Sequence, residues 1–438
     1  MAARVLVRVW NDGAWAAPTL DAELSRSAEL EPRDAGLATE LVYGVLRTLP
    51  VLERELDARA SSDRWKKTPR LRAHLAIATY TILFLDRVPP FAAVSEAVEA
   101  VKRFGGKKVG GFANAVLRRV AEAAEKAPRG HEALAEASRA SLPGWLRRAL
   151  RRALGDELEA FLAGDEPPPL CLCLAAGEDR AAHVEALRAA RPGARVEPGE
   201  LSPRAIRLWG AGHQRRLPGA AEGAFDVQEE GAQALALMVG AGPGEAVLDA
   251  CAGRGNKSLL LAEAVGAEGA VDAADLHPNK LARLAEEPAG RPKPRHTFAV
   301  DWTRGRGGAT GPYDRILVDA PCSGVGTLRR RPEILGRLRK ADVTRLADLQ
   351  RRIVTQVAPL LRVEGRLVYA VCSVLEAEAE EVIAALTAGP LEGGVELASV
   401  PFDGAFARGV AGEATSLRLL PGRHGTDGYF VASLKRVR

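Results

Sequence analysis

Two cysteines stand just after short apolar runs that the sequence predicts as β-strands. Cys322 follows the run Arg315 to Asp319 and the dipeptide Ala-Pro, and Cys372 follows the run Arg366 to Ala370. Because the carboxyl ends of strands in a doubly wound sheet gather along one edge, two residues far apart in sequence can share one crevice there. A single cysteine is more often a small buried hydrophobe. Two cysteines at strand ends, one of them preceded by Asp-Ala-Pro, favour reactive thiols.

A glycine-bearing turn follows a third predicted strand. The strand Val247 to Asp249 runs into Ala-Cys-Ala-Gly-Arg-Gly-Asn-Lys, and a helix is expected to begin at about Lys257. Such a turn exposes backbone N–H groups at a helix N-terminus, which suits an anionic or carboxylate-bearing ligand. Glycines at a turn can also be purely structural, so the turn alone leaves both interpretations open.

Carboxylates at successive strand ends extend this candidate ligand site. Asp275 ends the predicted strand Val271 to Leu276, and Asp301 follows the predicted strand Thr297 to Val300. Acidic side chains placed there can hold ribose hydroxyls, although any one of them is more often a helix cap or turn residue. A dinucleotide fingerprint is disfavoured because Ser258 stands where its third glycine belongs, and no P-loop frame fits. S-adenosylmethionine is therefore the better cofactor hypothesis.

The elements around these residues predict a multidomain chain. Up to about Lys126 apolar residues recur at helical spacing, with breaks at Val88 to Pro90 and at Phe104 to Gly106. We expect an all-α domain at 1–140. A helical segment with a small α/β linker domain at 141–225 follows; it has a strand at Leu170 to Leu174, whose two cysteines we interpret as packing residues. An α/β domain with a doubly wound parallel sheet is expected at 226–438.

Composition limits the function classes. The chain has 438 residues, a formal net charge of +5, 47% hydrophobic and 27% charged residues, which is typical of globular proteins and not of disordered ones. Its five cysteines show neither a disulfide framework nor zinc-knuckle spacing, and the histidines lack metal-ligand spacing. The start resembles no signal peptide, and the longest apolar stretch, Leu75 to Leu85, is too short to span a bilayer. We expect a cytoplasmic protein without metal or membrane.

The mild basic excess permits an RNA partner without requiring one. Clustered basic residues are candidate phosphate contacts, with a solvated helix face as the alternative for the last cluster. They are Arg329, Arg330 and Arg331; Lys102 and Arg103 with Lys107 and Lys108; Arg118 and Arg119; and Arg147, Arg148, Arg151 and Arg152. The first three are favoured because they follow the Cys322 segment. Few aromatic residues, 5% in all, leave little material for base stacking, so recognition of RNA shape is expected.

Taken together, these motifs resemble the RsmB/Sun/NOL-type RNA cytosine-5 methyltransferases. The resemblance rests on DAPCSGVGTLRRRPEI at Asp319 to Ile334, YAVCS at Tyr369 to Ser373, the turn at Val247 to Lys257, and GTDGYFVA at Gly425 to Ala432. Upstream, LVYGVLR at Leu41 to Arg47 and GFANAVLRR at Gly111 to Arg119 resemble the NusB-like domain found in front of such bacterial enzymes. The order of motifs covers nearly the whole chain and is typical of the RsmB subgroup, whose members modify 16S ribosomal RNA.

The resemblance implies a role for each matching residue. Cys372 would be the nucleophile that adds to the cytosine, Cys322 the cysteine associated with product release, and Asp319 a hydrogen-bond partner of the cytosine edge. The residues that would bind S-adenosylmethionine are Cys251, Ala252, Gly253, Arg254, Gly255, Asn256, Lys257, Asp275, Asp301 and Asp319. Ribosomal RNA, free or partly assembled and most plausibly 16S, would be the partner of a monomeric enzyme.

The sequence departs from the family pattern at four positions. Arg254 and Asn256 replace a proline and a glycine of the usual turn, Val371 replaces a threonine, and Ala379 replaces an asparagine. Because asparagine tolerates left-handed conformations, we expect the backbone contacts of the turn to survive. One alternative is an RNA-binding protein with a degenerate methyltransferase domain. Another is a methyltransferase for small molecules or proteins, which the cysteine pair disfavours because methylating a heteroatom needs no thiolate adduct.

Overall fold

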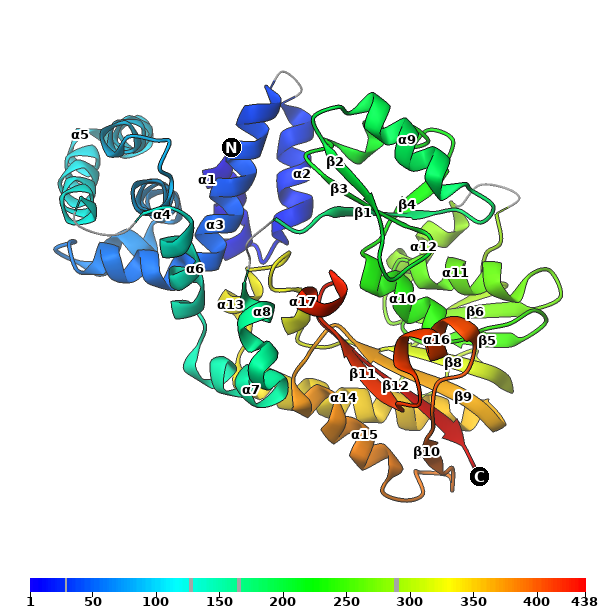
Figure 1. The fold of residues 1–438 in the computed structure, drawn as a ribbon. Coiled ribbons are helices and arrows are strands. Elements are labelled where there is room, and N and C mark those ends of the chain that lie inside the picture. The colour runs from blue at the N-terminus through cyan, green and yellow to red at the C-terminus, as the bar shows by residue number, and fades with distance from the viewer. Residues whose placement is uncertain (28–29, 126–128, 164–166, 287–290) are drawn as a thin grey trace. The chain divides into compact units, whose positions relative to one another are not determined.

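The computed structural model describes residues 1–27, 30–125, 129–163, 167–286 and 291–438. They group into two compact units (Figure 1). The helical unit consists chiefly of Met1–Arg147 together with Leu328–Arg337, and the sheet unit of Arg148–Phe161, Pro167–Thr327 and Leu338–Arg438. A short piece from the second half of the sequence therefore belongs to the helical unit.

The helical unit is built from α-helices, as predicted. They are α1 (Ala2–Asn11), α2 (Ala16–Arg26), α3 (Pro32–Asp57), α4 (Pro69–Phe84), α5 (Pro90–Ala124), α6 (His131–Ala140) and, in the returning piece, α13 (Ile334–Arg337). The predicted break near Pro89 separates α4 from α5. At the second predicted break the chain stays helical on both sides and kinks at Gly106, whose φ of 74° glycine adopts without steric cost.

Helix α3 contributes to the core of this unit. Its stretch Arg33–Asp57 is long and apolar enough, by length and composition alone, to cross a membrane. The core helix of a globular domain passes the same test, and Val42, Val45, Leu52 and Leu56 of α3 are fully buried against other helices. The helix therefore gives only weak evidence of a membrane span.

A small antiparallel sheet opens the second half of the fold. Its strand order is β2-β3-β1-β4, formed by β1 (Leu170–Leu174), β2 (Arg195–Pro198), β3 (Ala205–Trp209) and β4 (Phe225–Val227). Leu172 and Leu174 pack against Val184 and Leu187 of α9 (Arg180–Ala190), and Cys173 is buried against Ala236 and Leu260. The predicted domain boundaries at residues 140 and 225 stay a prediction.

The large sheet carries the candidate site. Its strands follow the order β10-β12-β9-β8-β5-β6-β7, and β11 pairs with β12. They are β5 (Ala246–Asp249), β6 (Ala270–Asp275), β7 (His296–Ala299), β8 (Tyr313–Asp319), β9 (Leu361–Val371), β10 (Leu397–Ser399), β11 (Ser416–Leu419) and β12 (Tyr429–Arg436). The strands β5 to β9 are parallel, but β12 runs antiparallel to β9.

The prediction of a parallel sheet is therefore incomplete at its carboxyl-terminal edge. Strands β11 and β12 are joined by a short connection containing α17 (Pro421–His424), and neighbouring strands with so short a connection pair antiparallel because a parallel pair needs a long crossover. The remaining helices of the sheet unit lie between strands or before them. They are α7 (Gly144–Leu154), α8 (Leu158–Leu162), α10 (Glu230–Met238), α11 (Asn256–Val265), α12 (Pro278–Ala285), α14 (Lys340–Val357), α15 (Glu380–Thr387) and α16 (Ala405–Ala411).

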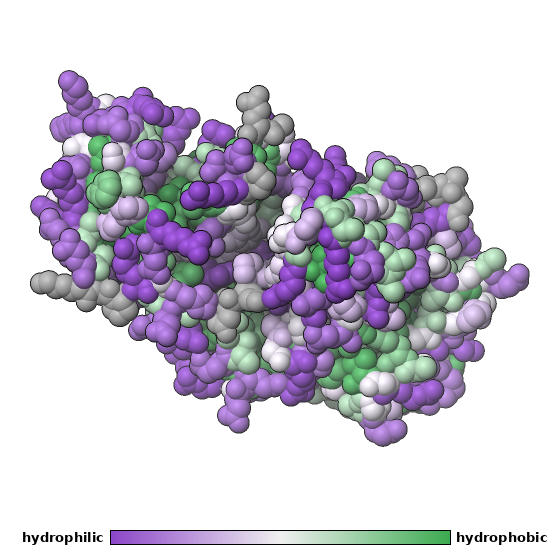
Figure 2. All heavy atoms as spheres, turned by 45° about the horizontal axis from the view of Figure 1, so that its top comes forward, coloured by the Kyte–Doolittle hydropathy of each residue, from purple (hydrophilic) through white to green (hydrophobic). Residues whose placement is uncertain are grey.

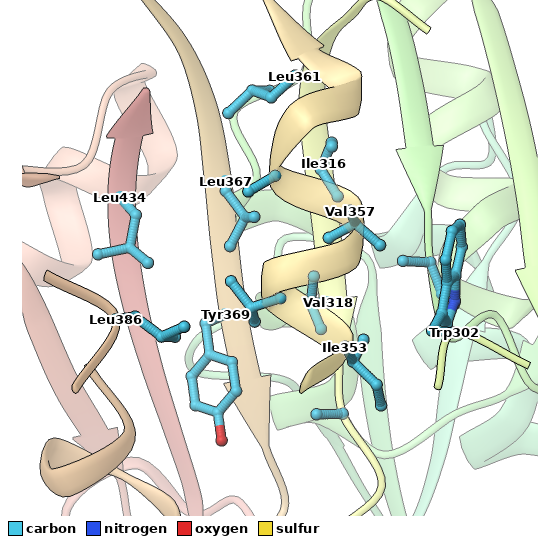
Figure 3. Packing of buried hydrophobic residues seen from close by; sticks show 14 of the residues in the cluster. Trp302, Ile316, Val318, Ile353, Val357, Leu361, Leu367, Tyr369, Leu386 and Leu434 are labelled. Atoms are coloured by element: carbon cyan, nitrogen blue, oxygen red, sulfur yellow. The ribbon is translucent and has the colours of Figure 1, made fainter. Parts of the chain in front are cut away.

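An aliphatic layer fixes α14 on the sheet. Ile353 and Val357 of α14 belong to one buried cluster with Val318 of β8 and Leu367 of β9, all four of which are labelled in Figure 3. All four side chains are almost completely buried, which anchors the two strands whose ends carry Cys322 and Cys372. On the surface, the face shown in Figure 2 carries mostly hydrophilic residues, and its hydrophobic residues form scattered patches.

Candidate active site

Three aspartates end neighbouring parallel strands. Asp249 is the last residue of β5, Asp275 of β6 and Asp319 of β8. Since β6, β5, β8 and β9 lie side by side and run parallel, these ends and Val371 of β9 share one edge of the sheet. The predicted convergence of the strand-end residues at one edge is thus observed.

The two cysteines lie in contact at this edge. The Sγ atoms of Cys322 and Cys372 are 3.3 Å apart. The hydrogen bond to Cys372, burial and the nearby Glu378 carboxylate together hold the pKa of the Cys322 thiol well above its usual value. Cys322 therefore stays protonated at neutral pH and can donate its S–H to the sulfur of Cys372.

Closely packed backbone holds the loop of each cysteine. The Gly326 amide donates to the Cys372 carbonyl at 3.0 Å, and the Gly428 amide donates to the Gly326 carbonyl at 2.8 Å. A Cβ atom on Gly326 would lie 1.8 Å from the Gly428 carbonyl oxygen, so only glycine fits where these loops cross. The GTDGYFVA motif thus supports the Cys372 loop through its Gly428 backbone.

A buried ion pair lies beside the thiols. The Lys257 ammonium donates to Asp319 Oδ2 at 2.5 Å. Burial alone would lower the pKa of Lys257, but the Asp319 carboxylate, helped by Asp249 and Cys372, outweighs burial and keeps that pKa above its usual value. Lys257, which the sequence pattern placed in the cofactor turn, therefore directs its charge toward Asp319.

The cofactor turn has the geometry of a ligand cradle. Gly253 and Gly255 adopt φ values of 58° and 86°, and α11 begins at the next residue. The Gly253 amide donates to Asp275 Oδ2 at 2.9 Å, while the space where a Cβ of Gly253 would lie is open. Open space beside backbone amides at the start of a ten-residue helix, with the carboxylates of Asp249 and Asp275 close by, fits a nucleoside cofactor with a charged tail.

Asn256 and Arg254 occupy the turn without distorting it. Asn256 is the first residue of α11, so its tolerance of left-handed conformations is not called upon. Its side chain donates to the Val227 carbonyl at 3.3 Å and accepts from Arg283 at 2.9 Å. Arg254 is exposed. The left-handed positions fall on Gly253 and Gly255, both of which the chain retains.

Asp301 also lies near the strand ends, after β7. Its Oδ1 accepts hydrogen bonds from the amide and hydroxyl of Thr303, which hold the pKa of this carboxyl below its usual value. Next to it Trp302 is buried and donates its Nε1–H to the Ala250 carbonyl at 2.7 Å. This bond connects the Asp301 segment to the start of the cofactor turn.

Sequence reasoning missed Asp249. Its side chain is 1% exposed, and the Ser258 hydroxyl donates to Oδ2 at 2.6 Å. Burial raises the pKa of this carboxyl to about 6. The strand-end argument that singled out Asp275 applies equally to Asp249, so this residue was within reach of the sequence.

The favoured RNA contacts Arg329 to Arg331, and Lys102 with Arg103, lie in the helical unit, whereas Arg148, Arg151 and Arg152 belong to the sheet unit. Lys102 and Arg103 are exposed on α5, where Lys102 pairs with Glu99 at 2.6 Å. Arg331 is also exposed, but Arg329 and Arg330 are half-buried.

Throughout the described ranges no three His, Cys, Asp or Glu side chains gather as metal ligands would.

Comparison with known proteins agrees with this geometry. Residues 236–435 match the family model of the 16S rRNA methyltransferase RsmB/F, and residues 1–122 match that of the NusB family. The ribosomal RNA small subunit methyltransferase B of Pseudomonas putida is 33% identical, over 100% of this chain and 98% of its own. The protein of that name from Xylella fastidiosa is 33% identical, over 99% and 96%.

A solved structure shares the whole fold. The crystal structure of PH0851 superposes with a TM-score of 0.81 at 23% identity, covering 99% of this chain and 98% of the other. The family matches establish a methyltransferase whose cofactor is S-adenosylmethionine, in agreement with the turn and its carboxylates. The chain therefore belongs to the 16S rRNA methyltransferase RsmB/F family and carries a NusB family domain at its N-terminus.

Proposed function

We propose that this protein methylates carbon 5 of a cytosine in ribosomal RNA, 16S by family, through a covalent adduct with Cys372. One observation carries the proposal: two thiols with sulfur atoms 3.3 Å apart stand at the sheet edge where the cofactor turn also ends. Methylating a heteroatom needs no thiol, whereas carbon 5 of cytosine must first be activated.

The family resemblance gives Cys372 the role of the nucleophile in this proposal. Its thiolate adds to carbon 6 of cytosine, and the electron pair of the 5,6 double bond becomes available at carbon 5. That pair forms the new bond to the methyl group, which S-adenosylmethionine supplies when bound, leaving S-adenosylhomocysteine. A base then takes the proton from carbon 5, the bond between carbon 6 and sulfur breaks, and the thiolate leaves with its electron pair.

The neighbours of Cys372 support these steps. The Lys257 ammonium holds Asp319 in place through their ion pair. By the family resemblance, the Asp319 carboxylate would hydrogen-bond the polar edge of the cytosine and favour protonation of its ring nitrogen. Cys322, kept as a thiol, lies against the departing sulfur, where it promotes release of the product.

The proposed cofactor contacts are those that the family resemblance implies. The amides of the turn from Cys251 to Lys257 would hold the charged tail, Asp275 the ribose, and Asp301 the adenine side. The target base must leave any stack to reach the thiols, which fits recognition of one flipped base in a folded RNA.

Replacing either cysteine tests the mechanism. We expect Cys372→Ala to abolish methylation and Cys322→Ala to accumulate a protein–RNA adduct that survives denaturing electrophoresis, because only release is impaired. Cys171→Ala, on β1 of the small sheet, is the matched control and should leave methylation unchanged. Bisulfite sequencing of 16S RNA treated with each protein reports the product. Methylation by Cys372→Ala at the parental rate contradicts the mechanism.

For RNA binding we propose that the exposed Lys102, Arg103 and Arg331 contact phosphates, and that Arg329 and Arg330 contribute less because they are half-buried. Arg331→Ala should weaken RNA binding and reduce the slope of log K against log salt by about 1. Filter binding at several salt concentrations measures the slope. Arg345→Ala, an exposed arginine on α14, provides a comparison outside the proposed contacts, and an equal loss there contradicts the assignment.

A further inference from the structure

A glutamate with no exposed surface lies behind both cysteines. Glu378 ends a short 3-10 helix, Glu376–Glu378, and its side chain is 0% exposed. Among the described residues no cation pairs with it. A carboxylate removed from water without a counter-ion is costly unless hydrogen bonds satisfy its oxygens. The donors that satisfy Glu378 therefore indicate what it holds.

These donors come from the residues that follow the two cysteines. The Ser323 amide donates to Glu378 Oε1 at 2.8 Å, and the Ser323 hydroxyl donates to Oε2 at 2.5 Å. The Ser373 hydroxyl donates to the same Oε2 at 2.7 Å, and the two serine oxygens are 3.3 Å apart. One carboxylate thus binds both Cys-Ser dipeptides.

A second layer fixes the carboxylate itself. Gln350 of α14 donates to Glu378 Oε1 at 3.1 Å and to the Pro321 carbonyl at 3.0 Å. The Tyr369 hydroxyl, which Figure 3 shows pointing away from the aliphatic layer, donates to the Glu378 carbonyl at 2.7 Å. Gln350 therefore connects Glu378 to the residue that precedes Cys322, so the Cys322 loop is held on both sides of its thiol.

We propose that Glu378 is a positioning residue that clamps the Cys322 and Cys372 loops together, so that the two sulfur atoms stay in contact. The two loops follow different strands, β8 and β9, and the backbone bond from Gly326 to Cys372 joins them on one side. The Glu378 carboxylate joins them through Ser323 and Ser373 on the other. The effect of the clamp on methyl transfer rests on the proposed function, but its effect on the contact of the two sulfur atoms does not.

Closing a disulfide tests the geometry without RNA or cofactor. Diamide accepts two electrons and two protons from a pair of thiols, becomes the hydrazine, and leaves a disulfide whose rate of formation depends on how closely the sulfurs are held. In Glu378→Ala we expect the Cys322–Cys372 bond, identified by peptide mass spectrometry, to form about 10²-fold more slowly than in the parent. Glu381→Gln, an exposed glutamate on α15, is the control and should match the parent.

Methyl transfer provides the second readout. Glu378→Ala should lower kcat by about 10²-fold, since a misplacement of 1 Å costs that much, and leave KM for S-adenosylmethionine unchanged. Glu378→Gln should lie closer to the parent, because an amide of the same shape can still bridge Ser323 and Ser373. If Glu378→Ala does not fold, Ser373→Ala removes a single donor of the clamp and should slow both reactions in the same direction.

The outcomes separate the two proposals. Disulfide formation in a folded Glu378→Ala at the parental rate overturns the clamp, whatever its activity. If Glu378→Ala forms the disulfide slowly but the parent enzyme makes a product other than 5-methylcytosine, the clamp is supported and the proposed reaction is overturned.

Discussion

The buried carboxylate of Asp249 should make the free energy of unfolding depend on pH. Burial raises its pKa from an ordinary 3.8 to about 6, so the folded protein binds the proton more tightly than the unfolded chain does. Its contribution to stability is therefore full below pH 3.8 and is lost as the pH rises through about 6. Above that pH the ionised carboxylate destabilises the fold.

Asp249→Asn should consequently stabilise the protein at pH 8 by up to roughly 3 kcal/mol relative to the parent, and by almost nothing at pH 4. The asparagine oxygen can still accept from Ser258. Urea unfolding of both proteins at the two pH values measures the difference. Asp301→Asn is the control, because the pKa of that surface carboxyl is lowered and no gain at high pH is expected. Equal or lower stability of Asp249→Asn at pH 8 would falsify this account.

The same buried charges set the local chemistry. Asp249 and Asp319 raise the pKa of Lys257, and the Glu378 carboxylate contributes to the raised pKa of Cys322. Removing Asp249 should therefore also affect catalysis, in keeping with the common conflict between stability and function at active sites.

At the scale of elements, the turn between β5 and α11 depends on two glycines for different reasons. Both have positive φ, which costs a residue with a side chain about 1–2 kcal/mol. A Cβ on Gly255 would in addition lie 2.2 Å from the buried side chain of Leu284, whereas a Cβ on Gly253 would meet nothing within 4 Å. Gly255 is thus required for packing as well as for conformation.

Gly255→Ala should therefore abolish measurable S-adenosylmethionine binding, while Gly253→Ala should keep it with a Kd raised about tenfold, the equivalent of its backbone strain. Titration calorimetry measures both, and thermal unfolding checks that each variant is folded. Equal effects of the two substitutions would show that contact with Leu284 does not matter for the turn.

The sequence predicts these elements well because each has a local signal. The runs that predicted β1, β5, β6 and β8 end within a residue of the observed strands, since apolar stretches bounded by turn residues depend on neighbours in the chain. Strand ends also located Asp275, Asp319 and both cysteines. Where only the fold brings residues together, no such signal exists.

Glu378 illustrates this limit. Four glutamates lie between Glu376 and Glu381, and nothing in their order shows that one is completely buried while Glu381 is exposed. Its partners Ser323 and Gln350 are 55 and 28 residues away. The antiparallel edge of the sheet was missed for a related reason, because strand direction depends on connections that periodicity does not describe.

At the scale of the whole molecule, the segment Leu328–Arg337 returns to the helical unit after the Cys322 loop. Glu333, 4% exposed, accepts the Ala16 amide at 2.9 Å, and the Arg337 guanidinium donates to the Val9 carbonyl at 3.1 Å and to that of Ala14. Arg47 donates to the Arg329 carbonyl at 3.3 Å. Arg329, Arg330 and Arg331 thus stand on a segment that the N-terminal helices hold in place.

A fragment of residues 148–438 should lose this protection. Without α1 to α6, the buried Glu333 and Ile334 have no packing partners among the N-terminal helices, so the segment becomes accessible and trypsin should cleave between Arg329 and Arg337 much faster than in the full chain. Arg304, whose side chain is 85% exposed in a part of the sheet unit that contains none of these helices, provides the internal control and should be cleaved equally in both proteins. Mass spectrometry of a digestion time course identifies each site. Unchanged protection of the segment in the fragment would mean that the sheet unit alone holds it, and the contacts to Ala16 and Val9 would then be dispensable for its order.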